Sequence, residues 1–308
     1  MSEKYRNFSI ETVGDGIYAA IPNGGSNAGI VNLGDQTLIF DTFTTVGAAK
    51  ELKVAAERLT GRSPSLVVNS HAHADHYQGN VVFSDDAIII TSTKTRNAMA
   101  EESLVRLERM KNSIMEQAND FRKKLAQSTD GNERVQIEAV LKEYDDFFDG
   151  YPLPEDLRLP VMTFDKSITC HGSQRTAELI TFGGAHSPCD AVLWLPDDKV
   201  LFTADLVVSN DNLILTQGDP ANWVLIIVQL EALCPEVIVP GHGPVVSAKD
   251  GFQWARYYLA YMNNLVDELH GSPTQMSIEE LVPLRGCRKN WFIQNVQFLL
   301  ELRYPSAL

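Results

Sequence analysis

Basic residues are scarce in this sequence relative to acidic ones. It has 26 lysines and arginines against 40 aspartates and glutamates, which gives a formal net charge of −14. No stretch combines clustered basic residues with interleaved aromatic side chains, and a chain of this charge repels polyanions. We therefore expect no nucleic acid among its partners. The densest basic stretch, Arg285 to Lys289, is instead expected to begin a helix or to form a local salt bridge.

Cysteines and long apolar runs are also scarce. The four cysteines lie far apart with no Cys-x-x-Cys pair, so we predict neither a disulfide scaffold nor a thiolate metal site. Cys189 lies three residues after His186 and is expected to be a buried bystander, with a ligand or a pocket residue as the alternative. The polar start lacks the apolar core of a signal peptide, and no later run approaches membrane-spanning length. We expect a cytoplasmic protein that does not bind a membrane.

What the sequence does have is an ordinary globular composition and a dense histidine motif. Of its 308 residues, 44% are hydrophobic and 21% are charged, as in soluble globular proteins. Three of the seven histidines fall within six residues, in the stretch Asn69-Ser70-His71-Ala72-His73-Ala74-Asp75-His76. The stretch follows Leu66-Val67-Val68, an apolar run typical of a buried strand.

The spacing of this motif suits metal binding. In an extended segment, residues two apart point to the same side, so His71 and His73 can bind one metal ion together. If the chain then turns into a short helix at Asp75, Asp75 and His76 are redirected and can reach a second ion nearby. The motif therefore predicts a metal site, with a polar loop of solvated histidines as the alternative.

Strand and helix patterns organise the rest of the chain. Strands are expected at residues 8–13, 16–21, 28–33, 37–40, 65–69 and 87–91, and again at residues 162–164, 167–170, 177–182, 191–195 and 200–204, which we assign to a second sheet. A further strand is expected at residues 236–239, and helices at residues 42–60, 222–233, 248–269 and around 292–300. The loop at residues 22–27 is either a mobile flap or an ordinary turn.

Residues 93–149 differ from their surroundings because helical periodicity runs through them, with a break at residues 128–132. We predict an antiparallel helical hairpin inserted into the core fold. It could cap an active site, form a homodimer contact, or simply pack as a surface decoration.

Several polar residues are expected to lie one to four residues beyond the end of a strand: Asp41, His71, His186, Asp205 and His242. Layered α/β proteins bind ligands in the loops beyond the carboxyl ends of strands, so these side chains are expected to meet. His171, in a turn, and His270, near a helix end, lack this setting and are left out of the site.

The motif His-x-His-x-Asp-His after a strand resembles the signature of the metallo-β-lactamase superfamily of hydrolases. Four further segments resemble the family's other motifs and follow in the family's order. They are Asp41 in Ile39-Phe40-Asp41-Thr42, His186 in Gly184-Ala185-His186-Ser187-Pro188, Asp205 in Phe202-Thr203-Ala204-Asp205 and His242 in Pro240-Gly241-His242-Gly243. The resemblance covers roughly residues 8–265. It implies an α/β fold, an αββα sandwich in which two mixed β-sheets pack face to face with helices outside. Residues 1–308 would form a single domain, with the hairpin at 93–149 as an insertion and residues 271–308 as a C-terminal helical extension.

The resemblance also implies a ligand set: His71, His73 and His186 would hold one metal ion, Asp75, His76 and His242 the other, and Asp205 would bridge the two. Asp75 would also act in catalysis by accepting a hydrogen bond from the attacking water. Asp41 is expected to orient a ligand imidazole, with a plain turn aspartate as the alternative. Because the set lacks thiolates, we predict two divalent ions, zinc in the first place, with Fe or Mn also admitted.

The predicted function is that of a dinuclear metal-dependent hydrolase, in which a metal-activated water or hydroxide cleaves an ester, thioester, lactone, lactam or phosphoester of a small molecule. True β-lactamases of the superfamily usually carry Cys or Ser where this chain has Asp205, which argues against antibiotic hydrolysis as the main activity. Two alternatives stay open: a mononuclear iron enzyme resembling persulfide dioxygenases, and a noncatalytic metal-binding module.

Overall fold

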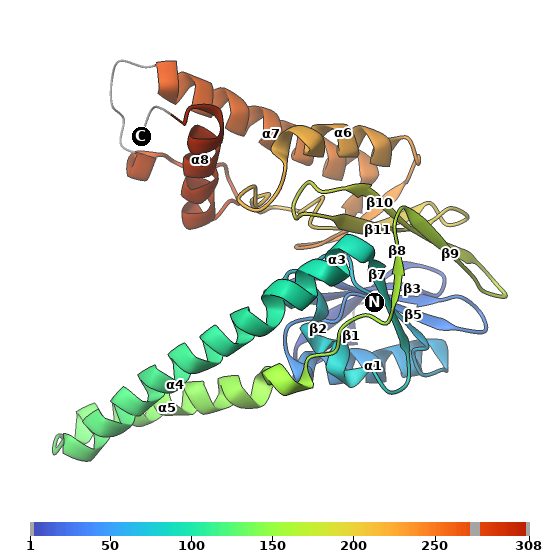
Figure 1. Cartoon of the computed structure of the whole chain (residues 1–308). Helices are drawn as coiled ribbons and strands as arrows, with labels where there is room; N and C mark the ends of the chain where they lie inside the picture. The colour runs from blue at the N-terminus through green and yellow to red at the C-terminus, as the bar shows by residue number, and fades with distance from the viewer. Residues whose placement is uncertain (1–2, 272–277, 306–308) are drawn as a thin grey trace.

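The computed structural model describes residues 3–271 and 278–305, and shows two β-sheets packed face to face with helices on both outer faces (Figure 1). This arrangement confirms the predicted αββα sandwich. The parts of the predicted single domain at residues 1–2, 272–277 and 306–308 lie outside the described residues. In the described ranges, no helix is both long enough and apolar enough to cross a membrane.

The first sheet has eight strands that follow one another in sequence order: β1 (Glu3–Lys4), β2 (Phe8–Gly14), β3 (Ile17–Pro22), β4 (Ala28–Asn32), β5 (Thr37–Phe40), β6 (Leu66–Val68), β7 (Ile88–Ser92) and β8 (Met162–Phe164). Strands β1 to β5 pair antiparallel, whereas β5 to β8 pair in parallel. All four residues of β5 are buried, as expected for a strand covered on both faces.

The second sheet has six strands, in the spatial order β14 (Val246–Ser247), β13 (Val237–Pro240), β12 (Val200–Ala204), β11 (Asp190–Leu195), β10 (Thr176–Gly183) and β9 (Ser167–His171). Its pairs are antiparallel except for β12 and β13, which are parallel. The chain crosses from β12 to β13 through the helix at residues 220–231, as a parallel pair requires. His171, expected in a turn, is the last residue of β9.

The sequence predicts the wrong sheet for one strand. The run at residues 162–164 is expected in the second sheet, but it forms β8 and pairs in parallel with β7, with Ile90 opposite Met162 and Ser92 opposite Phe164. Only Asp165 and Lys166 then separate β8 from β9, so the chain passes from one sheet to the other in that turn. The sequence pattern of this strand is the same whichever sheet it joins, so the pattern alone could not decide between them. In the first sheet, β8 covers the edge that β7 would otherwise expose.

The helices bury apolar faces against the outer side of each sheet. Helix α1 (Val46–Thr60) packs Leu52, Ala55 and Ala56 onto the first sheet, and it begins where the Thr45 side chain accepts a hydrogen bond from the backbone N–H of Ala48. Helices α6 (Pro220–Glu231) and α7 (Ala248–Gly271) cover the second sheet, and α8 (Lys289–Arg303) packs against α7 (Figure 1). Ser247 precedes α7, and its hydroxyl accepts a hydrogen bond from the backbone N–H of Asp250 at 3.1 Å.

The facing sides of the two sheets form a third apolar layer. Phe40 of the first sheet and Phe202 of the second lie with ring centroids 5.7 Å apart in this layer. The sheets are therefore held at a fixed separation, and the loops at their common edge are held with them.

The predicted helical hairpin is present between β7 and β8. Helix α3 (Thr93–Ala98) and a π-helical turn (Met99–Ser103) lead into α4 (Leu104–Gln127), and α5 (Gly131–Gly150) returns beside it. The pair extends away from the body of the molecule (Figure 1). Short turns of 3₁₀ helix at Pro154–Asp156 and Ile278–Glu280 precede β8 and α8.

Candidate metal centre

The polar residues predicted to meet do lie together at one edge of the sandwich. Each follows a strand by one to three residues: Asp41 after β5, His71 after β6, His186 after β10, Asp205 after β12 and His242 after β13. The first two come from the first sheet and the others from the second. Because each strand end is fixed by its sheet, the loops deliver these side chains to one place.

The first group of potential ligands contains His71, His73, His186 and Asp205. One donor atom from each lies within 4.8 Å of the others. His73 Nδ1 lies 3.0 Å from His71 Nε2 and 2.8 Å from His186 Nε2. Three imidazole nitrogens and a carboxylate oxygen therefore converge, as in a site for one metal ion.

The second group contains Asp75, His76 and His242, whose donor atoms also lie within 4.8 Å of one another. Helix α2 (Ala74–Tyr77) begins directly after His73. This early turn redirects Asp75 and His76 as the sequence predicts. Asp75 Oδ2 lies 3.8 Å from His76 Nε2 and 3.6 Å from His242 Nε2.

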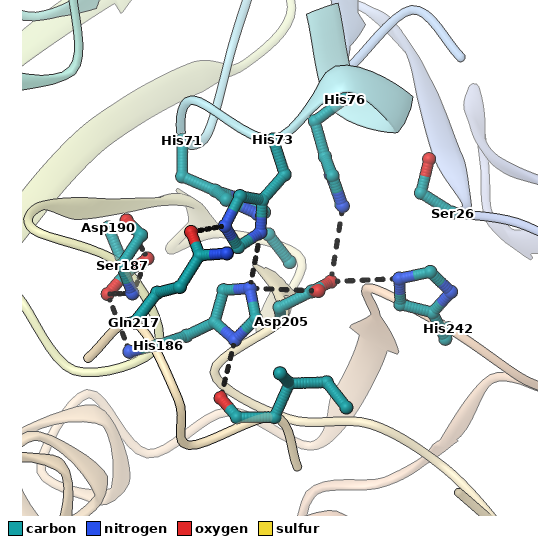
Figure 2. A network of polar contacts seen from close by, with 12 residues as sticks. Ser26, His71, His73, His76, His186, Ser187, Asp190, Asp205, Gln217 and His242 are labelled. Atoms are coloured by element: carbon teal, nitrogen blue, oxygen red, sulfur yellow. Dashed lines mark hydrogen bonds and ion pairs between the residues drawn. The ribbon is translucent and has the colours of Figure 1, made fainter. Parts of the chain in front are cut away.

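Asp205 lies between the two groups, with one oxygen facing each (Figure 2). Its Oδ2 is 3.2 Å from His186 Nε2, while its Oδ1 is 3.3 Å from both His76 Nε2 and His242 Nε2. Gly241 permits this position, because a Cβ there would lie 2.0 Å from Asp205 Oδ1. The carboxylate is placed as a bridging ligand would be.

The donor atoms are arranged for binding metal ions rather than for hydrogen bonding to one another. His76 Nε2 and Asp205 Oδ1 are buried and have no hydrogen-bond partner among the residues that the structure describes. Buried polar atoms without partners are costly, so a ligand between them is the simplest explanation. Imidazole and carboxylate donors without thiolate suit Zn²⁺, Fe or Mn.

Asp41 contacts the centre through His76 rather than directly. Its Oδ2 accepts a hydrogen bond from His76 Nδ1 at 2.7 Å, and its two oxygens accept from the hydroxyl and the backbone N–H of Ser70, each at 2.8 Å. This fixes the His76 ring with Nε2 turned toward Asp205. The backbone of Asp41 is in the left-handed region, at φ 61°, which is a strained conformation for a non-glycine residue.

Some contacts that orient the imidazoles could not be read from the motif. Gln217 Oε1 lies 2.9 Å from His73 Nε2, and the carbonyl of Ile214 accepts a hydrogen bond from His186 Nδ1 at 3.1 Å. Both residues lie in the loop between β12 and α6, which no sequence signal marked. The buried carboxylate of Asp190 accepts hydrogen bonds from the backbone N–H groups of Ala185, His186 and Ser187, which holds the turn that carries His186.

The loop at residues 22–27 also contacts the centre. The carbonyl of Gly25 accepts a hydrogen bond from His242 Nδ1 at 2.9 Å, and the hydroxyl of Ser26 donates to the carbonyl of Asp75. Asn27 reaches across to the other sheet and donates to the carbonyls of Pro240 and Gly243, at 2.9 and 2.7 Å. The loop therefore flanks the centre and fixes the ring of His242.

Burial keeps the histidines of the first group neutral. It lowers the pKa of His71 well below 6.5, and it lowers the pKa of His186 to about 3. Burial lowers the pKa of His73 as well. At neutral pH these three rings therefore offer a lone pair to a metal ion without first losing a proton.

The second group has the opposite electrostatics. Burial alone would lower the pKa of His76, but the carboxylates of Asp205, Asp75 and Asp41 raise it well above 6.5. The pKa of His242 is also raised, against burial, mainly by Asp205. These two rings therefore hold a proton more tightly than a free imidazole does, and a metal ion must compete with that proton.

A cavity of about 710 Å³ opens over the centre. Its floor includes His73, Asp75, His186, Asp205 and His242. Its rim includes the loop at residues 22–25 and, at the start of α8, Arg288 and Trp291. Of the residues described, none from α4 or α5 lines the cavity.

The remaining histidines and the cysteines stay apart from the centre in the described chain. His270 stacks on Tyr304 at a centroid distance of 3.7 Å near the end of α7. Cys189 is buried, with its sulfur 3.1 Å from the Ser92 hydroxyl and 3.2 Å from that of Thr181. It is buried, as the sequence predicts, and it also lines a second cavity together with residues of β10.

Comparison with known proteins agrees with this geometry. A profile of the metallo-beta-lactamase superfamily matches residues 21–242. No curated protein matches the sequence.

Solved structures with the same fold are similar at low sequence identity. A metallo-β-lactamase from Pontibacter korlensis is 18% identical, covers 84% of this chain and 99% of its own, and superposes with a TM-score of 0.61. The FIM-1 metallo-β-lactamase from Pseudomonas aeruginosa in its mono-zinc form is 13% identical, with 84% and 97% coverage and a TM-score of 0.60. The DIM-1 metallo-β-lactamase is 18% identical, with 85% and 99% coverage and a TM-score of 0.57. At these identities the likeness shows the fold alone.

Proposed function

The chain belongs to the metallo-β-lactamase superfamily, and from this premise we propose that it is a hydrolase of small molecules that uses two divalent metal ions, in the first place zinc. The reaction would cleave an ester, thioester, lactone, lactam or phosphoester. The observation that carries the proposal is the position of Asp205, whose two carboxylate oxygens face two separate groups of donor atoms.

Each group would hold one ion. His71, His73 and His186 would bind the first, Asp75, His76 and His242 would bind the second, and Asp205 would bind both. Bound ions would lower the pKa of a water molecule toward neutrality and polarise the carbonyl or phosphoryl oxygen of the substrate.

The protein's own residues would hold and orient the reactants. Asp75 lines the cavity and is only partly buried, so its carboxylate can accept a hydrogen bond from the attacking water and take its proton. The hydroxyl of Ser26 donates to the backbone carbonyl of Asp75 and holds that segment in place. Asp41 would keep His76 in the tautomer whose Nε2 is free.

The cavity supports a small substrate. A volume of about 710 Å³ is within the range of sites that bind drug-sized molecules. The rim combines Arg288, whose guanidinium is paired with Asp211 at 2.8 Å, with an aromatic ring, Trp291. Asp205 also supports hydrolysis of something other than a β-lactam antibiotic, since the β-lactamases of the superfamily usually carry Cys or Ser there.

Metal analysis and a substrate panel test the proposal together. We expect about two zinc ions per chain, and turnover of at least one member of a panel of ester, thioester, lactone, lactam and phosphodiester substrates. His71→Ala should remove metal and activity together while the protein stays folded. His270→Ala is the matched control, because it removes a histidine that stacks on Tyr304 outside the centre.

Each alternative gives a different result. About one iron per chain, with oxygen consumption on a persulfide substrate, would favour the oxygenase. Two bound metal ions without turnover on any substrate would favour a metal-binding module.

A further inference from the structure

The carbonyl of Ile214 decides which nitrogen of His186 is free. It lies 3.1 Å from His186 Nδ1. A carbonyl oxygen can only accept a hydrogen bond, so the proton of the neutral ring is on Nδ1. His186 Nε2 then presents its lone pair toward His73 and Asp205. If the Ile214 carbonyl turned away, the ring could take the other tautomer, which cannot bind a metal through Nε2.

Asn295 of α8 holds the chain on both sides of Ile214. Its side-chain amide donates to the carbonyl of Leu213 at 2.6 Å and accepts from the backbone N–H of Leu215 at 2.9 Å. These two bonds fix the orientation of the peptide groups around Ile214. Asn295 is completely buried, so water does not compete for its amide.

The amide of Asn295 is itself held by a buried network. Its second N–H donates to the Tyr258 hydroxyl at 2.9 Å, and that hydroxyl donates to Asn212 Oδ1 at 3.0 Å. Asn212 Nδ2 donates in turn to the carbonyl of Arg288 at 3.1 Å. Both long C-terminal helices are thus connected to the loop between β12 and α6. A buried network whose members are all partnered is rigid and costly to disturb.

We propose that Asn295 is a positioning residue for His186: through the Leu213–Leu215 segment it fixes the Ile214 carbonyl and hence the metal-binding tautomer of the ring. Asn295 lies beyond residue 242, where the match to the superfamily profile ends. Helix α8 would therefore act on the metal site as well as pack against α7. The proposal rests on the proposed metal site but not on any particular hydrolytic activity.

The test replaces Asn295 by Leu, which has a similar size and removes both bonds to the loop. Val296→Ala is the matched control, because Val296 is the next residue on α8, is completely buried, and removing its methyl groups weakens packing without touching the network. The ring tautomer of His186 is read from the ¹⁵N chemical shifts of its imidazole in the metal-free protein. Zinc affinity and the absorption spectrum of the cobalt(II) protein are measured on the loaded protein.

We expect Asn295→Leu to give a mixture of His186 tautomers, about 10-fold weaker binding of the ion held by His186, and a changed cobalt spectrum, since losing a residue that orients a ligand typically weakens metal binding 10- to 100-fold. Val296→Ala should lower thermal stability with none of these changes. Tyr258→Phe removes only the hydroxyl beside Asn295 and should shift the tautomer and the affinity in the same direction by less.

An Asn295→Leu protein that folds and matches Val296→Ala in tautomer, affinity and spectrum overturns the proposal. If Asn295→Leu does not fold, Tyr258→Phe decides, and an unchanged tautomer and affinity in that variant overturn it. A protein that binds metal but hydrolyses nothing would refute the proposed function and leave this inference standing.

Discussion

Asp41→Asn should selectively weaken binding of the second metal ion, the one held by Asp75, His76 and His242. Asp41 is buried and has a left-handed backbone, which Asn tolerates better than most other non-glycine residues, so the substitution adds no backbone strain. The new Oδ1 can still accept from the Ser70 N–H. The new NH₂ group, however, faces His76 Nδ1, where the wild-type carboxylate accepts a hydrogen bond at 2.7 Å.

Two donors then face each other, and His76 loses the contact that keeps Nε2 free. The ring can satisfy the amide only by moving its proton to Nε2, which blocks metal binding through that atom. Removing such an orienting partner typically weakens metal binding 10- to 100-fold. This corresponds to about 1.4–2.7 kcal/mol, in line with ~1.5–3 kcal/mol for a hydrogen bond to a charged group.

Zinc titration against a competing chelator measures the effect, with metal content after gel filtration as a second readout. The ion held by Asp75, His76 and His242 should bind 10- to 100-fold more weakly, as expected for loss of an orienting partner. The other ion should change less, because Asp41 reaches His71 only through the Ser70 hydroxyl. Asp35→Asn is the control: Asp35 accepts a hydrogen bond from Ser173 in an exposed turn. Wild-type affinity for both ions in Asp41→Asn would refute the reasoning.

Further outcomes follow from the charges around the cavity. Asp205 raises the pKa values of His76 and His242, so binding of the second ion should release protons while binding of the first should not. The affinity for the second ion should therefore fall as the pH falls, by about 1.4 kcal/mol per proton and pH unit. Calorimetric zinc titrations in buffers of different ionisation enthalpy check this, and equal proton release for both ions would contradict it. Arg288→Ala should raise KM for anionic esters about fivefold, equivalent to ~1 kcal/mol for an exposed charge, and should leave kcat and neutral esters unchanged. Trp291→Ala should raise KM for aryl esters relative to alkyl esters. For Arg288→Ala or Trp291→Ala, a loss of kcat on all substrates with unchanged KM would contradict a role of that side chain in substrate binding.

The convergence of the site could be predicted because its signals are local. His71, His73, Asp75 and His76 lie within one short stretch, and Asp205 directly follows the strand that positions it. Strand patterns are strong in buried sheets, and the carboxyl ends of strands that run in the same direction meet at one edge of a sheet.

The contacts that orient the rings could not be predicted in this way. The carbonyl of Ile214 carries no sequence signal, since every residue has a carbonyl. Its direction depends on Asn295, and the bond from Leu215 to Asn295 spans 80 positions. The same reason explains the strand at residues 162–164, whose pattern predicts a strand but cannot name the neighbour with which it pairs.

The two sheets contribute different halves of the metal centre. The motif at residues 71–76 comes from the first sheet, and His186, Asp205 and His242 come from the second. Asn27 adds a direct bond across the same boundary, 213 positions from the carbonyl that it contacts. Ions bound here would join the layers at their open edge, so the layers could not part without breaking bonds to metal. Metal supply would then govern how long the folded protein survives in the cell as well as whether it can react.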